Sequence, residues 1–248
     1  MARQFKAWAA PAAWGRVGVV AALPEEAAVL ARRRLPRGGQ AEAGLNLRVL
    51  VSGAGRDNAL RAAETLLAGG VECLLSWGCA AGLSPEARPG DLALAARVRS
   101  AAGDVYAADP GMRQWLLRQL PPGARVLDGD LLESLHLVAA GAEKQALHRA
   151  SGAAALDMES AAVFEAAARA GVPCLAVRAV ADPVDLTLPP AVAAALNADG
   201  MVEPSILLKQ LFRYPGQIPA LISLGLNFNA AVSALKQAAA GMARADAA

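Results

Sequence analysis

Short apolar runs alternate with stretches of helical periodicity along most of the chain. The apolar runs predict strands, and the amphipathic stretches between them predict helices. The predicted strands are Arg16–Ala22, Leu45–Val51, Cys73–Gly78, Asp91–Val98, Arg125–Asp130, Ala153–Leu156 and Cys174–Ala181. The predicted helices are Pro24–Arg34, Asp57–Ala68, Pro110–Gln119, Glu143–Ala150 and Met158–Ala170. Because strands that alternate with helices favour parallel pairing, we predict a single-domain, three-layer α/β fold around a central mixed, mostly parallel sheet.

The character of the chain changes after about residue 186, where a helical C-terminal extension is predicted. Its last helical stretch, beyond Pro219, carries an apolar stripe at helical spacing. The stripe consists of Leu221, Leu224, Phe228, Val232 and Leu235. It packs on the sheet or a second subunit, or it faces a lipid, and the sequence leaves these alternatives open. Two asparagines and a proline make this region a poor candidate for a transmembrane span.

The first fifteen residues are predicted to form a flexible leader, and residues 16–248 to form one domain that includes the extension. Arg3 and Lys6 precede an Ala-rich stretch that superficially resembles a signal peptide. Pro11 counts against that reading, and the first core strand follows without a spacer. A frayed terminus is therefore favoured.

Composition narrows the classes of function. The 248 residues suffice for one large α/β domain. A formal net charge of +2, from 24 basic and 22 acidic residues, gives no field that argues for binding nucleic acid. Three cysteines without C-x-x-C spacing argue against a disulfide framework or a zinc knuckle, and favour a reduced, cytoplasmic setting. With only two histidines, a histidine-based metal centre is not expected. Carboxylate chemistry without a metal remains.

Carboxylates follow two of the predicted strands. Asp182 ends the apolar run Cys174–Ala181, and the Asp157-Met158-Glu159 sequence follows the run before it. Open α/β sheets bind their ligands at the carboxyl ends of the strands. We therefore expect these acids to serve one site. The structural alternatives are that Asp157 caps the following helix and that Asp182 belongs to an Asp-Pro turn.

Three further segments follow strands in the same way. Leu23-Pro24-Glu25-Glu26 is an ordinary helix start, but it also delivers Glu26 to the edge of the sheet. Small residues dominate the other two segments and allow close approach of the backbone to a ligand. These are Ser52, Gly53, Ala54, Gly55 and Arg56 in one turn, and Gly78, Cys79, Ala80, Ala81 and Gly82 in the other.

Taken in this order, the motifs resemble the purine nucleoside phosphorylase and methylthioadenosine/S-adenosylhomocysteine nucleosidase family. The resemblance covers roughly Val17 to Asp185. It implies a nucleoside phosphorylase-like fold, a homo-oligomer, and an enzyme that cleaves the N-glycosidic bond of an adenine nucleoside without a cofactor. Water or inorganic phosphate is the co-substrate.

The resemblance also implies a role for each matched residue. Glu26 corresponds to the acid that activates water, and Asp182 to the general acid that protonates purine N7. Glu159 accepts from the ribose hydroxyls, while Met158 packs under the sugar. The turn that contains Ser52, Gly53, Gly55 and Arg56 suits an anion or a ribose oxygen. Gly78, Cys79 and Ala80 belong to the loop beside the base.

The chain departs from the family pattern at three places. Ala181 replaces the serine that usually precedes the acid, and Cys79 stands where a hydroxyl residue is common. The aromatic residue expected before Asp157 is missing, and the sequence there is Leu135–Val138. Arg178, on the last predicted strand, is interpreted as a paired core arginine outside the site.

The tail after Asp182 is most similar to the hopanoid-associated phosphorylases, which implies adenosylhopane, a substrate with a large apolar 5′ substituent. The alternatives are phosphorolysis of the same substrate, a methylthioadenosine or adenosylhomocysteine nucleosidase, and a non-catalytic nucleoside-binding or membrane-docking protein. A cytoplasmic enzyme is expected, with peripheral contact at the inner membrane if the C-terminal stripe faces lipid. Glu26 beside the nucleophile would repel phosphate, whereas Arg56 would attract it, so hydrolysis is favoured and phosphorolysis stays open as an alternative.

Overall fold

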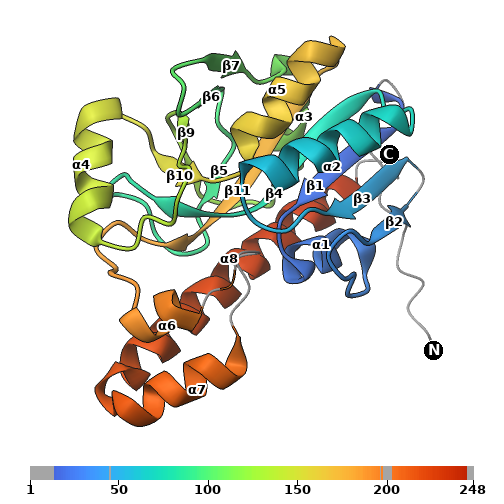
Figure 1. Ribbon diagram of the computed structural model, residues 1–248. Coiled ribbons are helices and arrows are strands. Elements are labelled where there is room, and N and C mark those ends of the chain that lie inside the picture. Colours follow the sequence, from blue (N-terminus) through green and yellow to red (C-terminus); the bar gives the residue numbers. More distant parts are fainter. Residues whose placement is uncertain (1–13, 45, 196, 198–202, 245–248) are drawn as a thin grey trace.

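The computed structural model describes residues 14–44, 46–195, 197 and 203–244, and within them eleven strands form one sheet (Figure 1). The main path through the sheet is β2-β3-β1-β4-β10-β9-β6-β7, with β11 paired to β4 and β5, and β8 paired to β5. The strands are β1 (Val17–Ala21), β2 (Gln40–Ala43), β3 (Leu47–Val51), β4 (Cys73–Gly82), β5 (Leu92–Ala93), β6 (Arg97–Arg99), β7 (Val105–Ala107), β8 (Val126–Leu127), β9 (Leu131–Glu133), β10 (Ala155–Asp157) and β11 (Cys174–Asp182). Parallel pairs outnumber antiparallel ones, which confirms the predicted mixed, mostly parallel sheet.

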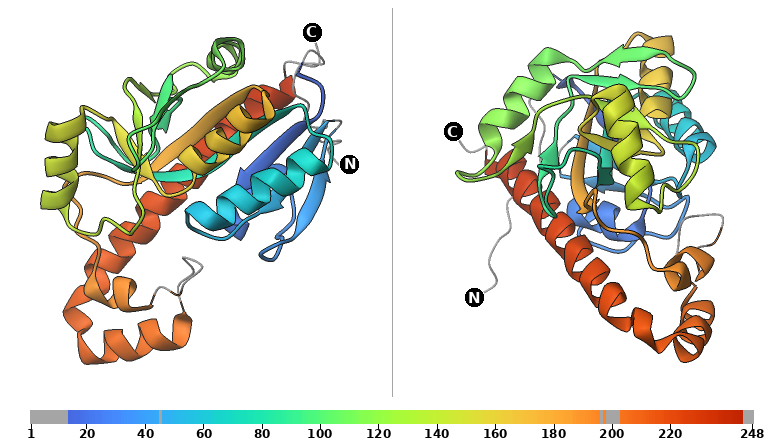
Figure 2. Two further views of the ribbon diagram at one scale, coloured as in Figure 1. Left: turned by 45° about the horizontal axis from the view of Figure 1, so that its top comes forward. Right: turned by 90° about the vertical axis from the view of Figure 1, so that its left-hand side faces the viewer.

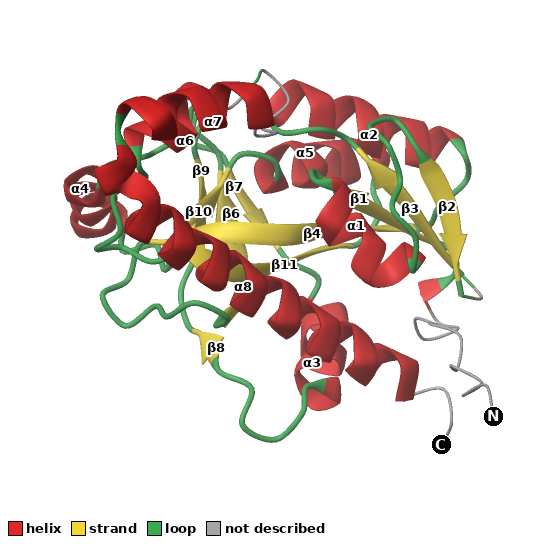
Figure 3. Ribbon diagram, turned by 90° about the horizontal axis from the view of Figure 1, so that it is seen from below, coloured by secondary structure: helices red, strands yellow, loops and turns green. Residues whose placement is uncertain are grey.

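Helices cover both faces of this sheet, as Figure 3 shows. They are α1 (Pro24–Ala31), α2 (Arg56–Ala68), α3 (Pro110–Gln119), α4 (Gly141–Ser151), α5 (Ser160–Ala170), α6 (Pro190–Ala195), α7 (Pro204–Arg213) and α8 (Ile218–Arg244), with a 3₁₀ turn at Pro215–Gln217. Helices α2 and α5 pack together on one face, while α1, α3 and the C-terminal half of α8 cover the other. The three layers expected from the sequence are therefore present.

One predicted strand is divided in the structure and another is shortened. The apolar run Asp91–Val98 becomes β5, which pairs with β11 and β8, and β6, which pairs with β7 and β9. The run Arg125–Asp130 contains only the two residues of β8, and β9 begins after it. In the first case the chain crosses between two branches of the sheet, and apolarity alone does not reveal that crossing. Strands β2 and β7 were not predicted, because both are short and expose alternate residues.

The apolar stripe of the C-terminal helix packs against the body of the protein. Leu235 is fully buried, and Phe228 and Val232 pack against the core. The stripe therefore belongs mainly to the body, as the packing alternative predicted. A different set of apolar residues on α8 faces outward: Ile218, Ile222 and Leu226.

Most of the predicted leader, residues 1–13, lies outside the described residues. The last two leader residues, Trp14 and Gly15, contact the body. The ring of Trp14 packs edge-on against Trp115 with ring centroids 4.8 Å apart, and the carbonyl of Gly15 accepts from the Asn46 side chain. These two residues therefore pack on the body although the sequence analysis placed them in the leader.

Candidate active site

A cavity of about 630 Å³ opens at the carboxyl ends of the central strands. Strands β1, β4 and β11 run parallel, so the residues that follow them meet at one edge of the sheet. Strand β10 runs antiparallel to the far end of β4 and brings its own acids to the same place. The sequence-predicted residues that line the cavity are Glu26, Gly55, Cys79, Ala80, Met158, Glu159 and Asp182.

Glu26 lies in the first turn of α1 and is almost completely buried. Its carboxylate accepts two backbone hydrogen bonds, from the amide of Cys79 at 2.7 Å and from the amide of Leu23 at 3.0 Å. Burial raises the pKa of Glu26 above its ordinary value, and the nearby Arg178 opposes that rise. A fixed carboxylate with a raised pKa is suited to accept a proton near neutral pH.

Glu159 is held by the glycine turn across the cavity. Its Oε1 accepts from the backbone amide of Gly55 at 2.8 Å. Burial raises the pKa of Glu159 to about 7, with a further contribution from the neighbouring Asp157. Asp157 itself receives hydrogen bonds from the backbone of Ser160 and Glu159 at the start of α5, as the capping interpretation predicted.

Arg178 is the residue that connects these acids, and sequence reasoning left it outside the site. Its buried guanidinium pairs with Asp157, lies 3.7 Å from Glu159 Oε2, and donates to the hydroxyl of Ser76 at 2.8 Å. Removing an unpaired guanidinium from water is costly, so an arginine in the middle of an apolar strand requires buried acceptors. A lone arginine in an apolar strand was therefore the feature of the sequence that pointed to the buried acids.

Gly78 leaves room for this charged cluster. It lies opposite Arg178 in the β4–β11 register. A methyl group on its α-carbon would lie 2.6 Å from Nη1 of Arg178 and 2.7 Å from Cδ of Glu26. Glycine at this position therefore allows the guanidinium and the carboxylate to approach the strand, which is a different use from the predicted contact with the base.

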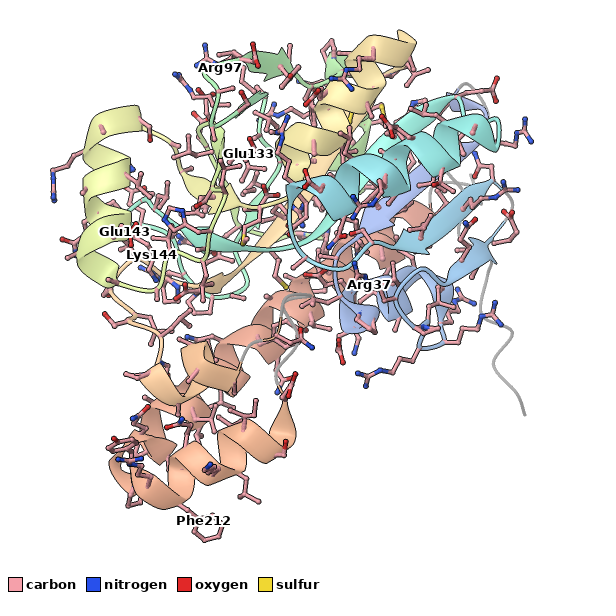
Figure 4. The ribbon with its side chains drawn as sticks, in the orientation of Figure 1. Arg37, Arg97, Glu133, Glu143, Lys144 and Phe212 are labelled. Atoms are coloured by element: carbon pink, nitrogen blue, oxygen red, sulfur yellow. The ribbon has the colours of Figure 1, made fainter. Side chains whose placement is uncertain are left out.

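Asp182 lies at the end of β11, where a lysine contacts it. Nζ of Lys144 donates to Oδ1 of Asp182 at 2.7 Å and to the carbonyl of Pro183 at 2.8 Å. Burial raises the pKa of Asp182, whereas Lys144 lowers it. Figure 4 labels Lys144 on α4. Sequence reasoning missed it because a helical lysine ordinarily faces solvent.

The residues of the turn after β3 do not all face the main cavity. Gly55 lines the cavity, but Ser52 lines a second hollow of about 400 Å³, and Gly53 faces the side chain of Arg37. The guanidinium of Arg56 pairs with Glu133 at 2.6 Å and also with Glu165. Ser52, Gly53 and Arg56 are thus not among the residues that the structure brings to the main cavity.

Cys79, Ala80 and Met158 also line the cavity, together with His136 from the segment that follows β9. Burial raises the pKa of the Cys79 thiol well above its ordinary value, so this side chain carries no negative charge near neutral pH. Among the described lining residues none is Phe, Tyr or Trp. The imidazole of His136 is the planar ring beside the cavity.

The described residues contain no group of three or more His, Cys, Asp or Glu side chains placed to hold a metal ion. The acids that line the cavity have other partners. Arg178 forms an ion pair with Glu159, and Lys144 forms one with Asp182. Two backbone amides donate hydrogen bonds to Glu26. The arrangement can therefore accept a proton, donate a proton and bind hydroxyl groups.

Comparison with solved structures returns the same fold. Futalosine hydrolase of Helicobacter pylori matches with a TM-score of 0.70 at 16% identity, over 94% of this chain and 99% of that chain. A 5′-methylthioadenosine/S-adenosylhomocysteine nucleosidase from Neisseria meningitidis, in complex with methylthio-immucillin-A, matches with a TM-score of 0.68 at 17% identity, over 93% and 99%. A single-residue mutant of the Helicobacter pylori nucleosidase, with 5′-methylthioadenosine in its active site, gives a TM-score of 0.69 at 16% identity, over 93% and 99%.

A search of curated proteins by sequence finds no match. The family model described as the phosphorylase superfamily matches residues 16–199, which is most of the chain and includes every predicted site residue. That match confirms the family-level part of the resemblance noted in the motifs. The chain belongs to the phosphorylase superfamily.

Proposed function

We propose that this protein releases adenine from an adenine nucleoside by hydrolysis of the N-glycosidic bond. The observation that carries the proposal is the convergence of Glu26, Glu159 and Asp182 on one cavity. The three acids come from three separate segments, and each has its own fixed partner. A non-catalytic nucleoside binder would not need a buried carboxylate with a raised pKa at each of these positions.

Each acid has one role in the proposed reaction. Asp182 donates a proton to N7 of the purine, so the electron pair of the breaking C1′–N9 bond leaves with a neutral base. Glu159 accepts hydrogen bonds from the ribose hydroxyls and stabilises the oxocarbenium-like sugar. Glu26 accepts a proton from water as the water oxygen bonds to C1′. The products are adenine and a free sugar.

Water is favoured over phosphate by the surroundings of Arg56. A phosphate site needs cations or free backbone amides. Here the Gly55 amide donates to Glu159, and the Arg56 guanidinium pairs with Glu133 and Glu165. Protein carboxylates thus already use the groups that would attract the anion.

The rim of the cavity favours an apolar 5′ substituent. Leu135 and Leu137 line it although both are exposed, and Leu188 and Ala193 lie beside them. This rim, with the tail that resembles hopanoid-associated phosphorylases, supports adenosylhopane as the substrate. We place the enzyme in the cytoplasm, where its three free cysteines stay reduced.

The second candidate is a nucleosidase for small 5′-thio nucleosides. It is favoured by the matched structures that contain 5′-methylthioadenosine or methylthio-immucillin-A. The absence of Phe, Tyr and Trp from the described lining argues against it, because a small substrate depends more on stacking of its base. Homo-oligomerisation remains a prediction.

One experiment separates these candidates. The protein is incubated with adenosine, methylthioadenosine and adenosylhopane, each with and without phosphate, and both products are identified. Release of adenine and a free sugar from adenosylhopane, at a rate independent of phosphate, supports the proposal. A sugar 1-phosphate would show phosphorolysis, and preference for methylthioadenosine would favour the second candidate. No base release from any of the three would refute the activity.

A further inference from the structure

The helices that follow the family-matched region carry an exposed apolar surface. Phe212 is 80% exposed, Leu226 64% and Ile222 60%. We call the surface the α7–α8 tip and define it as Leu208, Phe212, Tyr214, Ile218, Ile222 and Leu226. Figure 2 shows α7 and the start of α8 projecting from the body, and Figure 4 shows Phe212 directed away from it.

Helix α8 has different surroundings along its length. Its C-terminal half packs against β11, α1 and α3, and Leu235 there is fully buried. Ile218, Ile222 and Leu226 follow one another at intervals of four residues and so share one outward face. The segment Pro215–Met242 is long and apolar enough to cross a membrane by length and composition, and only 17% of its most apolar window is buried. Since its C-terminal half packs on the sheet, insertion would be confined to the tip.

Within helices α7 and α8, every charged residue is basic. From Pro204 to Arg244 the sequence contains no Asp or Glu, while Lys209 and Arg213 lie on α7 itself. The guanidinium of Arg213 lies 5.6 Å from the ring centre of Tyr214. Apolar and aromatic side chains beside cations are typical of segments that lie in the interface of an anionic membrane.

The tip is also connected to the candidate active site. Helix α6 packs against α7, and α6 contributes Ala193 to the lining of the main cavity. A surface that held the tip would therefore lie beside the helix that borders the cavity.

We infer that the α7–α8 tip docks the protein on a membrane surface that contains anionic phospholipid. The six apolar side chains enter the interfacial layer, and Lys209 and Arg213 meet the headgroups. The purpose of this docking rests on the proposed function: a nucleoside with a large apolar substituent resides in such a membrane, so docking brings the enzyme to its substrate. Docking itself requires no catalysis.

The test measures co-sedimentation of the full-length protein with vesicles, in the absence of nucleoside. One set contains phosphatidylcholine alone, and the other contains equal amounts of phosphatidylcholine and phosphatidylglycerol. We expect binding to the anionic vesicles only. Phe212→Ser with Leu226→Ser should reduce the partition coefficient at least about tenfold, and Lys209→Glu with Arg213→Glu should reduce it by a similar factor or more, since each cation contributes roughly fivefold. The matched controls are Val105→Ser and Arg33→Glu, exposed residues of the same kinds distant in sequence, which should bind as the parent does.

Three results would overturn the inference. The protein fails to bind anionic vesicles, the tip variants bind as well as the parent, or sedimentation in solution shows that the tip variants convert a dimer to a monomer while vesicle binding is absent. The last result would assign the tip to a second copy of the chain. Base release from adenosine by the same preparations tests the proposed function separately, so loss of docking with intact base release leaves the nucleosidase proposal standing.

Discussion

The ammonium nitrogen of Lys144 lies 2.7 Å from Oδ1 of Asp182, and the lysine side chain is completely buried. The same nitrogen donates to the carbonyl of Pro183, so it holds the carboxyl group against the end of β11. Burial of Asp182 favours its protonated form, whereas Lys144 favours the ionised form. This ion pair therefore controls both the orientation and the protonation of the proposed general acid.

We predict that Asp182→Asn lowers the rate of base release about 10²–10⁴-fold, because an amide cannot donate the proton to N7. The same substitution should also destabilise the protein by about 3 kcal/mol or more, since it leaves the Lys144 ammonium buried without a counter-charge. Both effects are measured on one preparation, by adenine release and by denaturant unfolding.

The double variant Asp182→Asn with Lys144→Met separates the two effects. It removes both charges, so it should recover most of the lost stability and none of the lost activity. An active single variant would remove Asp182 from the mechanism. A single variant with parental stability would contradict the assigned ion pair.

Lys144→Met alone should change the pH dependence of the reaction. The lysine lowers the pKa of Asp182, so its removal raises that pKa further above the ordinary value of an aspartate. Asp182 then stays protonated to higher pH, and the alkaline limb of kcat/KM against pH moves upward. Lys144→Arg keeps the charge and should leave this limb near its parental position. A purely structural lysine would lower activity at every pH without moving the limb.

Glu26→Gln should lower base release about 10²–10⁴-fold, because an amide cannot accept the proton from water. In the parent, the acidic limb should lie above the ordinary pKa of a glutamate, since burial raises the pKa of Glu26 and the group must be ionised to act. The control is Glu25→Gln. Glu25 is the preceding residue, but it pairs with Arg34 outside the cavity and should be replaceable. Equal losses in both variants would mean that the start of α1, rather than the Glu26 carboxylate, is required.

The sequence predicted the acids of this site but not the residues that pair with them. Glu26 and Asp182 follow β1 and β11, which both run parallel to β4, so a prediction of parallel strands is enough to bring these two acids to one edge. Glu159 reaches the same cavity from β10, which runs antiparallel to the end of β4, and that pairing is not visible in the sequence pattern. The partners of these acids are different. Lys144 lies on α4, and nothing in its neighbouring residues distinguishes a buried lysine from an exposed one.

Arg56 shows the opposite failure. Its place beside two glycines suggested an anion site, but Glu133 and Glu165, which are distant in sequence, take up its guanidinium. The C-terminal stripe was read correctly as an amphipathic pattern, yet the sequence could not say which side met the body. That choice depends on packing against β11, α1 and α3.

The last prediction concerns Glu159 and the pH dependence of stability. The pKa of Glu159 is about 7 in the folded protein, against an ordinary value of 4.5. Between these two values the folded state binds more protons than the unfolded state, so the contribution of this group is fully present below about pH 4.5 and is lost as the pH rises through about 7. Glu159→Gln has no such loss. Relative to the parent, the variant should therefore gain about 1 to 3 kcal/mol in unfolding free energy between about pH 5 and pH 8.

Glu159→Gln should also lose base release at every pH, because a neutral amide cannot stabilise the positive charge that develops on the ribose. Thermal and denaturant unfolding of both proteins at the two pH values measure the stability difference. If the variant gained nothing at the higher pH, Glu159 would be ionised throughout this range, and the Arg178 pair rather than burial would set its charge.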